Sequence, residues 1–346
     1  MPIEIPIDHR ALLESVRSRY GLEVTQLEYL NAGMVSAYRM TDRMTGSGGA
    51  FFLKLFPNTP YGFEAAARLE GEHSLLLALR ELNVLERIPT PVHALDGGTT
   101  SSFQGLPYAV YGFIEGHTIW ETWQDSLAGI AEILGRLHEG SSRLLGHDLK
   151  FPMPEEDFGL PFETKLLEDL QTLQNANSVS RPGVLMLRDL LLPRRHELLE
   201  LLNRAKAFQR LARGYSREFV VAHTDLHGGN LLLDSADQLW ALDWETARVA
   251  PPEHDLWSFH TSFTEFIPAY ERALGRRCEM DFDVLGFYFY RRNLEDLAMN
   301  VQQIMDGGRS DEQDREDIAG IQEHGFEAWP NLRPDLERVR VFLKHR

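Results

Sequence analysis

The sequence predicts an α+β protein with two lobes, a small sheet-rich N-terminal lobe and a larger, mostly helical C-terminal lobe. At 346 residues the chain is long for a single domain. Strand-like runs gather in the first 115 residues, whereas helical periodicity dominates from about residue 121. The stretch YGFIEGHT joins the two regions, so we expect a hinge there, with lobes 1–115 and 116–346. This order is typical of an enzyme whose site lies between lobes.

The N-terminal lobe is predicted element by element. Asp8 followed by HRALLESVRSRYG is typical of a capped helix that ends at Gly21. Three strand-like runs follow, VTQLEYL, VSAYRMT and GAFFLKLF, with the turn-rich DRMTGSGG between the second and third. Residues 63–82 have helical periodicity. TPVHALDGG and LPYAVYGFI predict two further strands, with TTSSFQG as their connection.

The C-terminal lobe is predicted to be mostly helical. TWQDSLAGIAEILGRLHEG has the pattern of an amphipathic helix, and residues 162–212 are mostly helical in character. The block FVVAHTDLHGGNLLLDSADQLWALDWE interrupts the helices with short strands and turns. Helical patterns resume over residues 253–305 and again near the C-terminus.

Composition narrows the class of protein. A hydrophobic content of 43% and a charged content of 25% are ordinary for a globular protein. The net charge of −17 argues against nucleic-acid binding, which needs a basic face. An acidic surface attracts magnesium complexes and amine-bearing small molecules, or it serves solubility alone.

No segment predicts a membrane span, and the first residues lack the apolar core of a secretory signal. The single cysteine, Cys278, cannot form an internal disulfide. We therefore expect a cytoplasmic protein that is a monomer or a homodimer.

The motif HTDLHGGN, which begins at His223, raises two interpretations. His223, Asp225 and His227 would share one face of a strand and suggest a zinc hydrolase. The glycines that follow favour a loop, however, and no HExxH stretch completes such a site. The pattern agrees better with phosphoryl transfer, in which Asp225 accepts a hydroxyl proton and Asn230, five residues later, holds magnesium.

A second oxygen ligand is predicted thirteen residues beyond Asn230. Strand LLL, turn DSAD and strand QLWAL separate Asn230 from Asp243. A β-hairpin of that length would return Asp243 to the side of Asn230. Carboxylate and amide oxygens suit Mg²⁺ bound to nucleotide phosphates.

The stretch HTDLHGGNLLL…ALDWE resembles the motif of the aminoglycoside phosphotransferase and choline kinase family, which shares the protein-kinase-like fold. PPEHDLW is similar to the continuation of that motif, and LGRLHEGS to the family's helix that ends in a leucine-histidine pair. The resemblance implies a bilobal kinase that uses Mg²⁺ and ATP, or GTP, to phosphorylate a hydroxyl of a small molecule. Protein substrates are disfavoured, because no activation segment is recognisable between Asp243 and PPEHDL.

The N-terminal lobe should supply a lysine and a carboxylate. Lys54 stands inside the apolar run AFFLKLF, where a lone charge is costly unless it has a partner or reaches solvent at a sheet edge. Among Glu64, Glu70 and Glu72 on the following helix, we predict Glu72 as the partner, with Glu70 as the alternative. Lys54 and Glu72 would together hold the α- and β-phosphates.

Two further nucleotide contacts are predicted. LNAGMVSAY is the expected turn over the phosphates, although its single Gly33 is also compatible with a plain hairpin. The resemblance suggests Ser36 as its side-chain contact. YAVYGFIEG resembles the family's hinge, where backbone groups of Tyr111, Gly112 and Phe113 would bond the adenine.

Three histidines are given lesser roles. We expect His138 to be a packed structural residue and His223 to orient the catalytic loop by hydrogen bonds. His227 either lies near the γ-phosphate or faces solvent.

Within the family, the chain resembles the members that phosphorylate spectinomycin, because FYFYRRNLEDLAMNVQQIM, outside the common core, has a counterpart there. This implies an aminoglycoside or aminocyclitol antibiotic as acceptor, and a role in resistance. A cationic acceptor would need carboxylates and aromatic faces. The candidates are Trp244, Glu245, Asp255, Trp257, Glu295 and Asp296.

Alternatives stay open for several of these assignments. Asp255 has a counterpart that more often supports the catalytic loop, and Glu295 and Asp296 are equally compatible with a helix-surface pair near Arg291 and Arg292. The acceptor could instead be choline, homoserine, methylthioribose or a sugar amine. A catalytically silent nucleotide-binding module is the remaining alternative.

Overall fold

The computed structural model describes residues 4–30, 35–42, 49–307 and 310–346. The chain forms two compact units. The first comprises Met1–Glu155, Val220–Ala250 and Glu265–Arg277, and the second comprises Glu156–Phe219, Pro251–Thr264 and Cys278–Arg346. The boundary between lobes at residues 115 and 116 stays a prediction.

The first helix, α1 (His9–Tyr20), begins and ends where the sequence predicts. The Asp8 side chain accepts hydrogen bonds from the backbone N–H groups of Arg10 and Ala11, at 2.9 and 3.1 Å. Gly21 ends the helix with φ 68°, a conformation that glycine adopts without strain. The residues of its predicted apolar face are all buried: Leu12, Leu13, Val16 and Tyr20.

A five-stranded antiparallel sheet follows, in the order β1-β2-β3-β5-β4. Its strands are β1 (Val24–Leu30), β2 (Ser36–Asp42), β3 (Ala50–Leu55), β4 (Thr100–Phe103) and β5 (Leu106–Gly112). The strand predicted from TPVHALDGG is wrong. That segment makes only an isolated bridge between Pro91 and Tyr111, and it turns at Gly97, where Ala94 accepts the N–H of Gly97. The predicted connection TTSSFQG supplies β4 instead.

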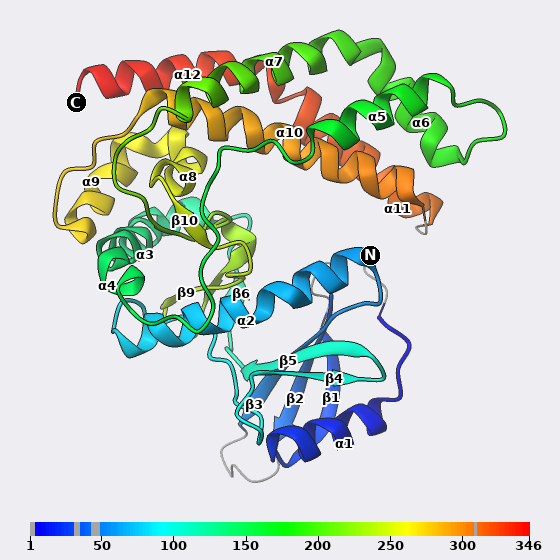
Figure 1. The fold of residues 1–346 in the computed structure, drawn as a ribbon, viewed down its shortest axis with the longest axis vertical. Coiled ribbons are helices and arrows are strands. Elements are labelled where there is room, and N and C mark those ends of the chain that lie inside the picture. The colour runs from blue at the N-terminus through cyan, green and yellow to red at the C-terminus, as the bar shows by residue number, and fades with distance from the viewer. Residues whose placement is uncertain (1–3, 31–34, 43–48, 308–309) are drawn as a thin grey trace. The chain divides into compact units, whose positions relative to one another are not determined.

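The two faces of the sheet carry different helices (Figure 1). Alternate residues such as Tyr38, Met40 and Leu53 pack against α1 in one apolar cluster. The helix α2 (Pro60–Glu81) covers the other face, where the Tyr111 hydroxyl bonds His73 of α2 at 2.7 Å. Lys54 therefore points toward the face that α2 covers, because its neighbours Leu53 and Leu55 belong to the α1 side.

The rest of the first unit consists of short elements around two small sheets. One sheet pairs β10 with β7, and the other has the order β6-β8-β9. The elements are β6 (His117–Thr118), η1 (Trp123–Ser126), α3 (Leu127–Glu139), α4 (Ser141–Leu145), β7 (Val220–Ala222), η3 (Gly228–Asn230), β8 (Leu231–Leu233), β9 (Leu239–Ala241) and β10 (Arg248–Ala250). Part of α9 (Phe263–Leu274) also belongs to this unit.

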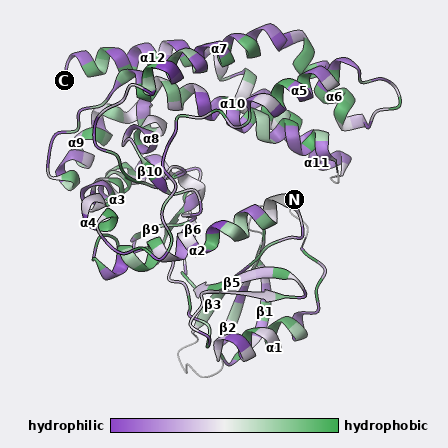
Figure 2. Cartoon of the chain, viewed as in Figure 1, coloured by the Kyte–Doolittle hydropathy of each residue, from purple (hydrophilic) through white to green (hydrophobic). Residues whose placement is uncertain are grey.

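The second unit is helical and is built around α10 (Phe282–Asp306), which packs against α5, α7 and α12. Its other elements are α5 (Glu163–Gln174), α6 (Pro182–Leu191), η2 (Leu192–Arg194), α7 (Arg195–Ala212), α8 (Glu253–Leu256), η4 (Trp257–Ser262), α11 (Asp311–Gly320), η5 (Ile321–Phe326) and α12 (Trp329–Lys344). Hydrophilic and hydrophobic residues alternate along these helices (Figure 2). Among the described residues, no helix has the length and apolarity needed to cross a membrane.

A buried carboxylate lies at the start of α10. Glu253 is fully buried, and its Oε1 accepts the backbone N–H of Asp281 at 2.6 Å. Asp281 in turn caps α10 through the N–H groups of Asp283 and Val284. Burial raises the pKa of Glu253 to about 7 from its ordinary 4.5.

This raised pKa predicts a decline in stability with rising pH. Between pH 4.5 and 7 the folded state keeps a proton that the unfolded state loses, so the free energy of unfolding falls by up to about 3 kcal/mol. Glu253→Gln keeps an acceptor for Asp281 and should remove this part of the decline. Urea unfolding at pH 5 and pH 8 measures it, with the exposed Glu312→Gln as control. Parallel pH profiles of the Glu253→Gln variant and the wild type would contradict the assignment.

Candidate active site

A hairpin brings the predicted magnesium ligands side by side. β8 and β9 are antiparallel, with Leu231 opposite Ala241. The N–H of Leu242 then donates to the carbonyl oxygen of Asn230 at 2.8 Å, which continues the pairing past the end of the strands. Asp243, the next residue, therefore lies beside Asn230, as the hairpin prediction requires.

Asn230 is oriented by Asp225. Its Nδ2 donates to the backbone oxygen of Asp225 at 2.9 Å and to Asp225 Oδ2 at 3.2 Å. These bonds use the donor end of the carboxamide, and its oxygen is the end that can coordinate a cation. One side chain thus fixes the Asp225 carboxylate and directs an oxygen ligand.

His223 connects the catalytic loop to the hairpin. It is fully buried, its Nε2 lies 2.9 Å from the carbonyl oxygen of Leu242, and its Nδ1 accepts the N–H of Asp225 at 3.4 Å. Because a carbonyl oxygen only accepts, the ring carries its proton on Nε2. The ring also packs on Trp244, with centroids 4.5 Å apart. These contacts support the predicted orienting role.

Two backbone positions at the site adopt the left-handed conformation. Thr224 has φ 73° and Asp243 has φ 60°. Neither is a glycine, so each conformation costs free energy that the surroundings must offset. The Thr224 hydroxyl offsets part of it by donating to the carbonyl oxygen of Thr246 at 3.0 Å. Strain of this kind concentrates at functional loops.

The Lys54 ammonium is buried among carboxylates. Its Nζ lies 3.0 Å from Asp243 Oδ1 and 3.5 Å from Glu245 Oε2. Burial alone would lower the pKa of Lys54, but the charges of Asp243, Glu72 and Glu245 outweigh it and raise the pKa above its ordinary value. Lys54 is therefore a permanent cation at this position.

Small residues make room for Lys54. In the sheet register its cross-strand neighbours are Ala37 on β2 and Ala109 on β5. Larger side chains at these positions would occupy the face over which Lys54 extends. The alternative of an edge-strand lysine is wrong, because β3 lies in the middle of the sheet.

Glu72 lies close to this group without a direct bond to Lys54. In the described part of the chain, the ion-pair partners of Lys54 are Asp243 and Glu245. Glu72 is buried and accepts the backbone N–H of Trp244; burial raises the pKa of Glu72 to about 7, although the Lys54 charge opposes this. The alternative, Glu70, is exposed. The charge of Glu72 nevertheless acts on Lys54, and the joint role of the two residues in holding phosphates stays a prediction.

Sequence reasoning missed Arg68, one helical turn before Glu72. Its Nη2 lies 3.5 Å from Glu245 Oε1, so Glu245 lies between two cations, Arg68 and Lys54. Glu245, a predicted substrate contact, connects α2 to the segment after β9, and its contact with a substrate stays a prediction. The sequence carried no local signal for this pair, because Arg68 and Glu245 are 177 residues apart in the chain.

The backbone N–H groups of the predicted adenine contacts Gly112 and Phe113 are already hydrogen-bonded within the protein. The N–H of Gly112 donates to the Thr90 oxygen and that of Phe113 to the Ala50 oxygen, both at 3.1 Å, so neither N–H is available to a base. In the described backbone the N–H groups of Ile114 and Glu115 have no such acceptor. Tyr111 is held in the sheet between β3 and Pro91.

Ser36, the predicted phosphate contact, is buried and accepts the N–H of Ile5 at 3.0 Å. Its hydroxyl is thereby engaged at the start of β2. Gly33 and the rest of the predicted turn at residues 31–34 lie outside the described residues.

The predicted acceptor contacts differ in their surroundings. Trp244 is 1% exposed and donates its indole N–H to the Ala241 oxygen at 2.9 Å, so its assignment as a substrate face is wrong and its role is packing beneath His223. Glu245 also belongs to the first unit, whereas Asp255, Trp257, Glu295 and Asp296 belong to the second. Trp257 is half-buried beside Phe289, and Asp255 is buried in α8.

Asp296 forms a surface pair with Arg292, whereas the half-buried Glu295 lies near the buried Arg291, whose closer partner is Glu156 at 3.0 Å. Glu295 lies 3.9 Å from Arg291 and Asp296 lies 2.8 Å from Arg292, each four residues apart on α10.

His138 is buried, and its Nδ1 lies 2.6 Å from the Tyr270 hydroxyl, in agreement with a structural role. His227 accepts the N–H of Gly229 on Nδ1 at 3.0 Å, and its Nε2 lies 3.7 Å from Asp225 Oδ2.

The donor set fits magnesium better than zinc. Within the ranges that the structure describes, no three His, Cys, Asp or Glu side chains converge as a metal site requires. Asn230 and Asp243 offer two oxygen donors, and Mg²⁺ commonly takes one or two protein ligands together with phosphates and water. The zinc hydrolase interpretation therefore finds no support.

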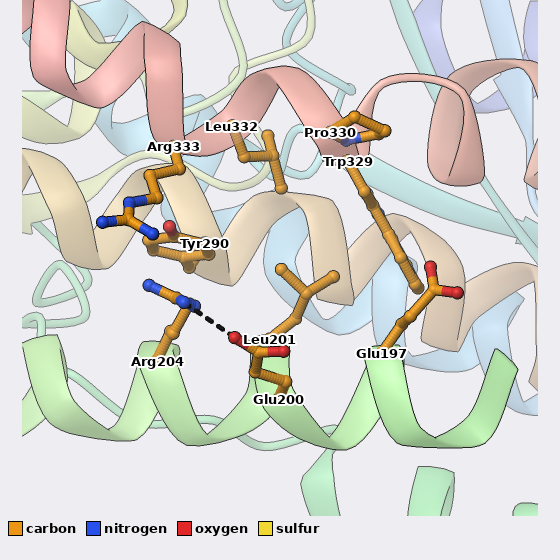
Figure 3. Close-up of a pocket in the computed structure, with 9 residues that line it drawn as sticks. All are labelled: Glu197, Glu200, Leu201, Arg204, Tyr290, Trp329, Pro330, Leu332 and Arg333. Atoms are coloured by element: carbon orange, nitrogen blue, oxygen red, sulfur yellow. Dashed lines mark hydrogen bonds and ion pairs between the residues drawn. The ribbon is translucent and has the colours of Figure 1, made fainter.

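A pocket of about 200 Å³ lies in the second unit between α7, α10 and α12 (Figure 3). Its walls include Tyr290, Trp329 and the Glu200–Arg204 ion pair, which measures 2.7 Å. None of the predicted site residues lines it.

Gly228 is required where the catalytic loop meets residues 119 and 120. A Cβ atom at Gly228 would lie 2.8 Å from Trp120 Cα and 2.9 Å from the Ile119 oxygen, both backbone atoms. Gly228→Ala should lower the free energy of unfolding by about 1–3 kcal/mol, measured by urea denaturation. The control is Gly71→Ala in α2, where a Cβ meets nothing within 4 Å and the helix should gain up to about 1 kcal/mol. Equal stability of the two variants would contradict the close contact of Gly228 with the backbone of Ile119 and Trp120.

Known proteins resemble this chain in fold. A solved spectinomycin phosphotransferase with ADP and spectinomycin matches with TM-score 0.73 and 16% identity, covering 92% of this chain and 95% of that one. An aminopropanol kinase matches with TM-score 0.62 and 17% identity over 95% and 99%. A choline kinase from Streptococcus pneumoniae matches with TM-score 0.51 and 14% identity over 95% and 98%. No curated protein sequence matches significantly.

These matches confirm the predicted α+β, protein-kinase-like fold. The model of the phosphotransferase enzyme family matches residues 37–288, more than half of the chain. The resemblance inferred from HTDLHGGNLLL is confirmed, as is the prediction of a phosphotransferase. The chain therefore belongs to the phosphotransferase enzyme family.

Proposed function

We propose that the protein transfers the γ-phosphoryl group of ATP, or of GTP, to a hydroxyl of an amine-bearing small molecule. One observation carries the proposal. Asp225 is hydrogen-bonded to Asn230, and Asn230 is bonded through its backbone to the hairpin that places Asp243 against Lys54. A base, two oxygen ligands and a fixed cation are the parts that phosphoryl transfer needs.

In this proposal Asp225 is the residue that orients the acceptor hydroxyl and takes its proton. Its Oδ2 is fixed by the Asn230 amide at 3.2 Å. The side chain therefore cannot rotate freely, and the hydroxyl would meet a carboxylate already in position. Because the proton can leave late in such reactions, a carboxylate base is sufficient.

Asn230 and Asp243 would hold Mg²⁺, which supplies charge neutralisation on the phosphates when it is bound. The Asp243 side chain is 42% exposed, whereas Lys54 is 14% exposed. Asp243 thus offers its second carboxylate oxygen on the open side, while Lys54 holds the first. Lys54 would neutralise phosphate charge from beneath.

The adenine would lie at the segment that leaves β5. The N–H groups of Ile114 and Glu115 have no acceptor in the described backbone and are the donors we assign to the base. Gly112 and Phe113 would contribute carbonyl groups only.

For the acceptor we propose an aminoglycoside or aminocyclitol antibiotic such as spectinomycin. The support is the likeness to spectinomycin phosphotransferase over 92% of the chain, together with a net charge of −17, which attracts cations. A small amino alcohol is the second candidate, favoured by the likeness to an aminopropanol kinase.

Asp225→Asn tests the proposed base. The amide cannot accept the proton, so kcat should fall about a hundred- to ten-thousand-fold, while nucleotide binding persists because Lys54 and Asp243 remain. Phosphate transfer is measured with spectinomycin and aminopropanol by coupled ADP release, and nucleotide affinity by calorimetry with magnesium. The exposed Asp189→Asn serves as control. Retained activity in Asp225→Asn would end the assignment of the base, and tight nucleotide binding without any transfer in the wild type would favour a silent nucleotide-binding module.

A further inference from the structure

An exposed tryptophan is attached to the catalytic loop. Trp120 is 62% exposed and follows directly after β6 and Ile119. β6 pairs with β8, with Thr118 opposite Leu232, and the N–H of Ile119 donates to the Gly228 oxygen at 3.2 Å. The backbone on which Trp120 stands is thus bonded to the loop that carries Asp225.

Both glycines of the HTDLHGGN motif lie under this tryptophan. A Cβ at Gly228 would meet Trp120 Cα at 2.8 Å, and a Cβ at Gly229 would meet the Trp120 ring at 2.9 Å. Single exposed hydrophobic residues are ordinary on protein surfaces. Here, however, two neighbouring residues without side chains allow the indole to lie directly on the loop.

His227 connects Trp120 to Asp225. The rings of Trp120 and His227 meet edge to face, with centroids 5.1 Å apart. The Nε2 atom of His227 lies 3.7 Å from Asp225 Oδ2. An aromatic face, an imidazole and the proposed base therefore follow one another along one surface of the loop.

The charges on this surface favour a cation. His227 accepts the Gly229 N–H on Nδ1, so the ring carries its own N–H on Nε2. Asp225 supplies a negative charge, and the exposed indole supplies the electron-rich face that ammonium groups bind. A neutral alcohol would still present its hydroxyl to Asp225, but it would gain no cation–π contact with the indole.

We propose that Trp120 and His227 form the wall of the acceptor site that binds the ammonium group of the substrate, beside the hydroxyl held by Asp225. The inference rests on the proposed kinase function and deepens it. Trp120 determines specificity for amines through a cation–π contact, and the two glycines hold it close to the base. Neither Trp244 nor Trp257 is needed for this contact.

The test compares two acceptors of the same shape. Choline and its uncharged carbon isostere, 3,3-dimethylbutan-1-ol, differ in the charge of one group, and aminopropanol and spectinomycin extend the panel. Trp120→Leu should raise KM for the amines about 3- to 30-fold, as expected for loss of a cation–π contact, with a smaller effect on kcat. The KM for the uncharged isostere should change much less.

Controls separate this role from folding. Trp120→Tyr keeps an aromatic face and should retain most of the affinity for amines, and Trp123→Leu removes a tryptophan from the neighbouring η1. The proposal would be overturned if Trp120→Leu weakened charged and uncharged acceptors equally, or if it left the KM for amines unchanged. It would also be overturned if the KM for the nucleotide rose as much as the KM for amines, or if the wild type bound no amine. If the wild type binds magnesium-nucleotide and phosphorylates only uncharged alcohols, this inference fails while the kinase function stands. If it binds no nucleotide, the proposed function itself fails.

Discussion

The buried charge of Lys54 is the constraint on which the site depends. An ammonium in the middle of a sheet is stable only if carboxylates surround it, and three of them do: Asp243, Glu245 and Glu72. Two of these carboxylates come from the segment after β9, so the position of that segment is fixed by the charge it must balance. The ion pair between Lys54 and Asp243 thus stabilises the lysine within the sheet, and it also positions Asp243, the proposed metal ligand.

The loop that carries Asp225 is held by two backbone bonds and by the side chain of His223. The carbonyl oxygen of Asn230 accepts a hydrogen bond from the N–H of Leu242, and the imidazole of His223 bonds the Leu242 oxygen. The carbonyl oxygen of Gly228 accepts a hydrogen bond from the N–H of Ile119. Two of these bonds tie the loop to Leu242, directly after β9, and the third ties it to Ile119, directly after β6. The strained φ values at Thr224 and Asp243 persist because the surrounding bonds leave the backbone no relaxed alternative.

Local signals in the sequence were sufficient to predict several elements of the fold and of the candidate site. Asp8 and Gly21 defined α1, and the spacing between Asn230 and Asp243 predicted the hairpin, because caps and short turns depend on neighbouring residues. The misplaced strand before β4, the hydrogen bonds that occupy Gly112 and Phe113, and the burial of Trp244 all depend on partners distant in the chain. Trp120 carried no signal either, since an exposed position is recognised only when its surroundings are known.

All the groups assigned to chemistry, from Lys54 to Asp243 and including Trp120, belong to the first unit, whereas Trp257, Glu295 and Asp296 belong to a helical unit with its own apolar core. The residues of the proposed chemistry and the residues of the helical core are therefore separate sets, and each set can be mutated without replacing a residue of the other.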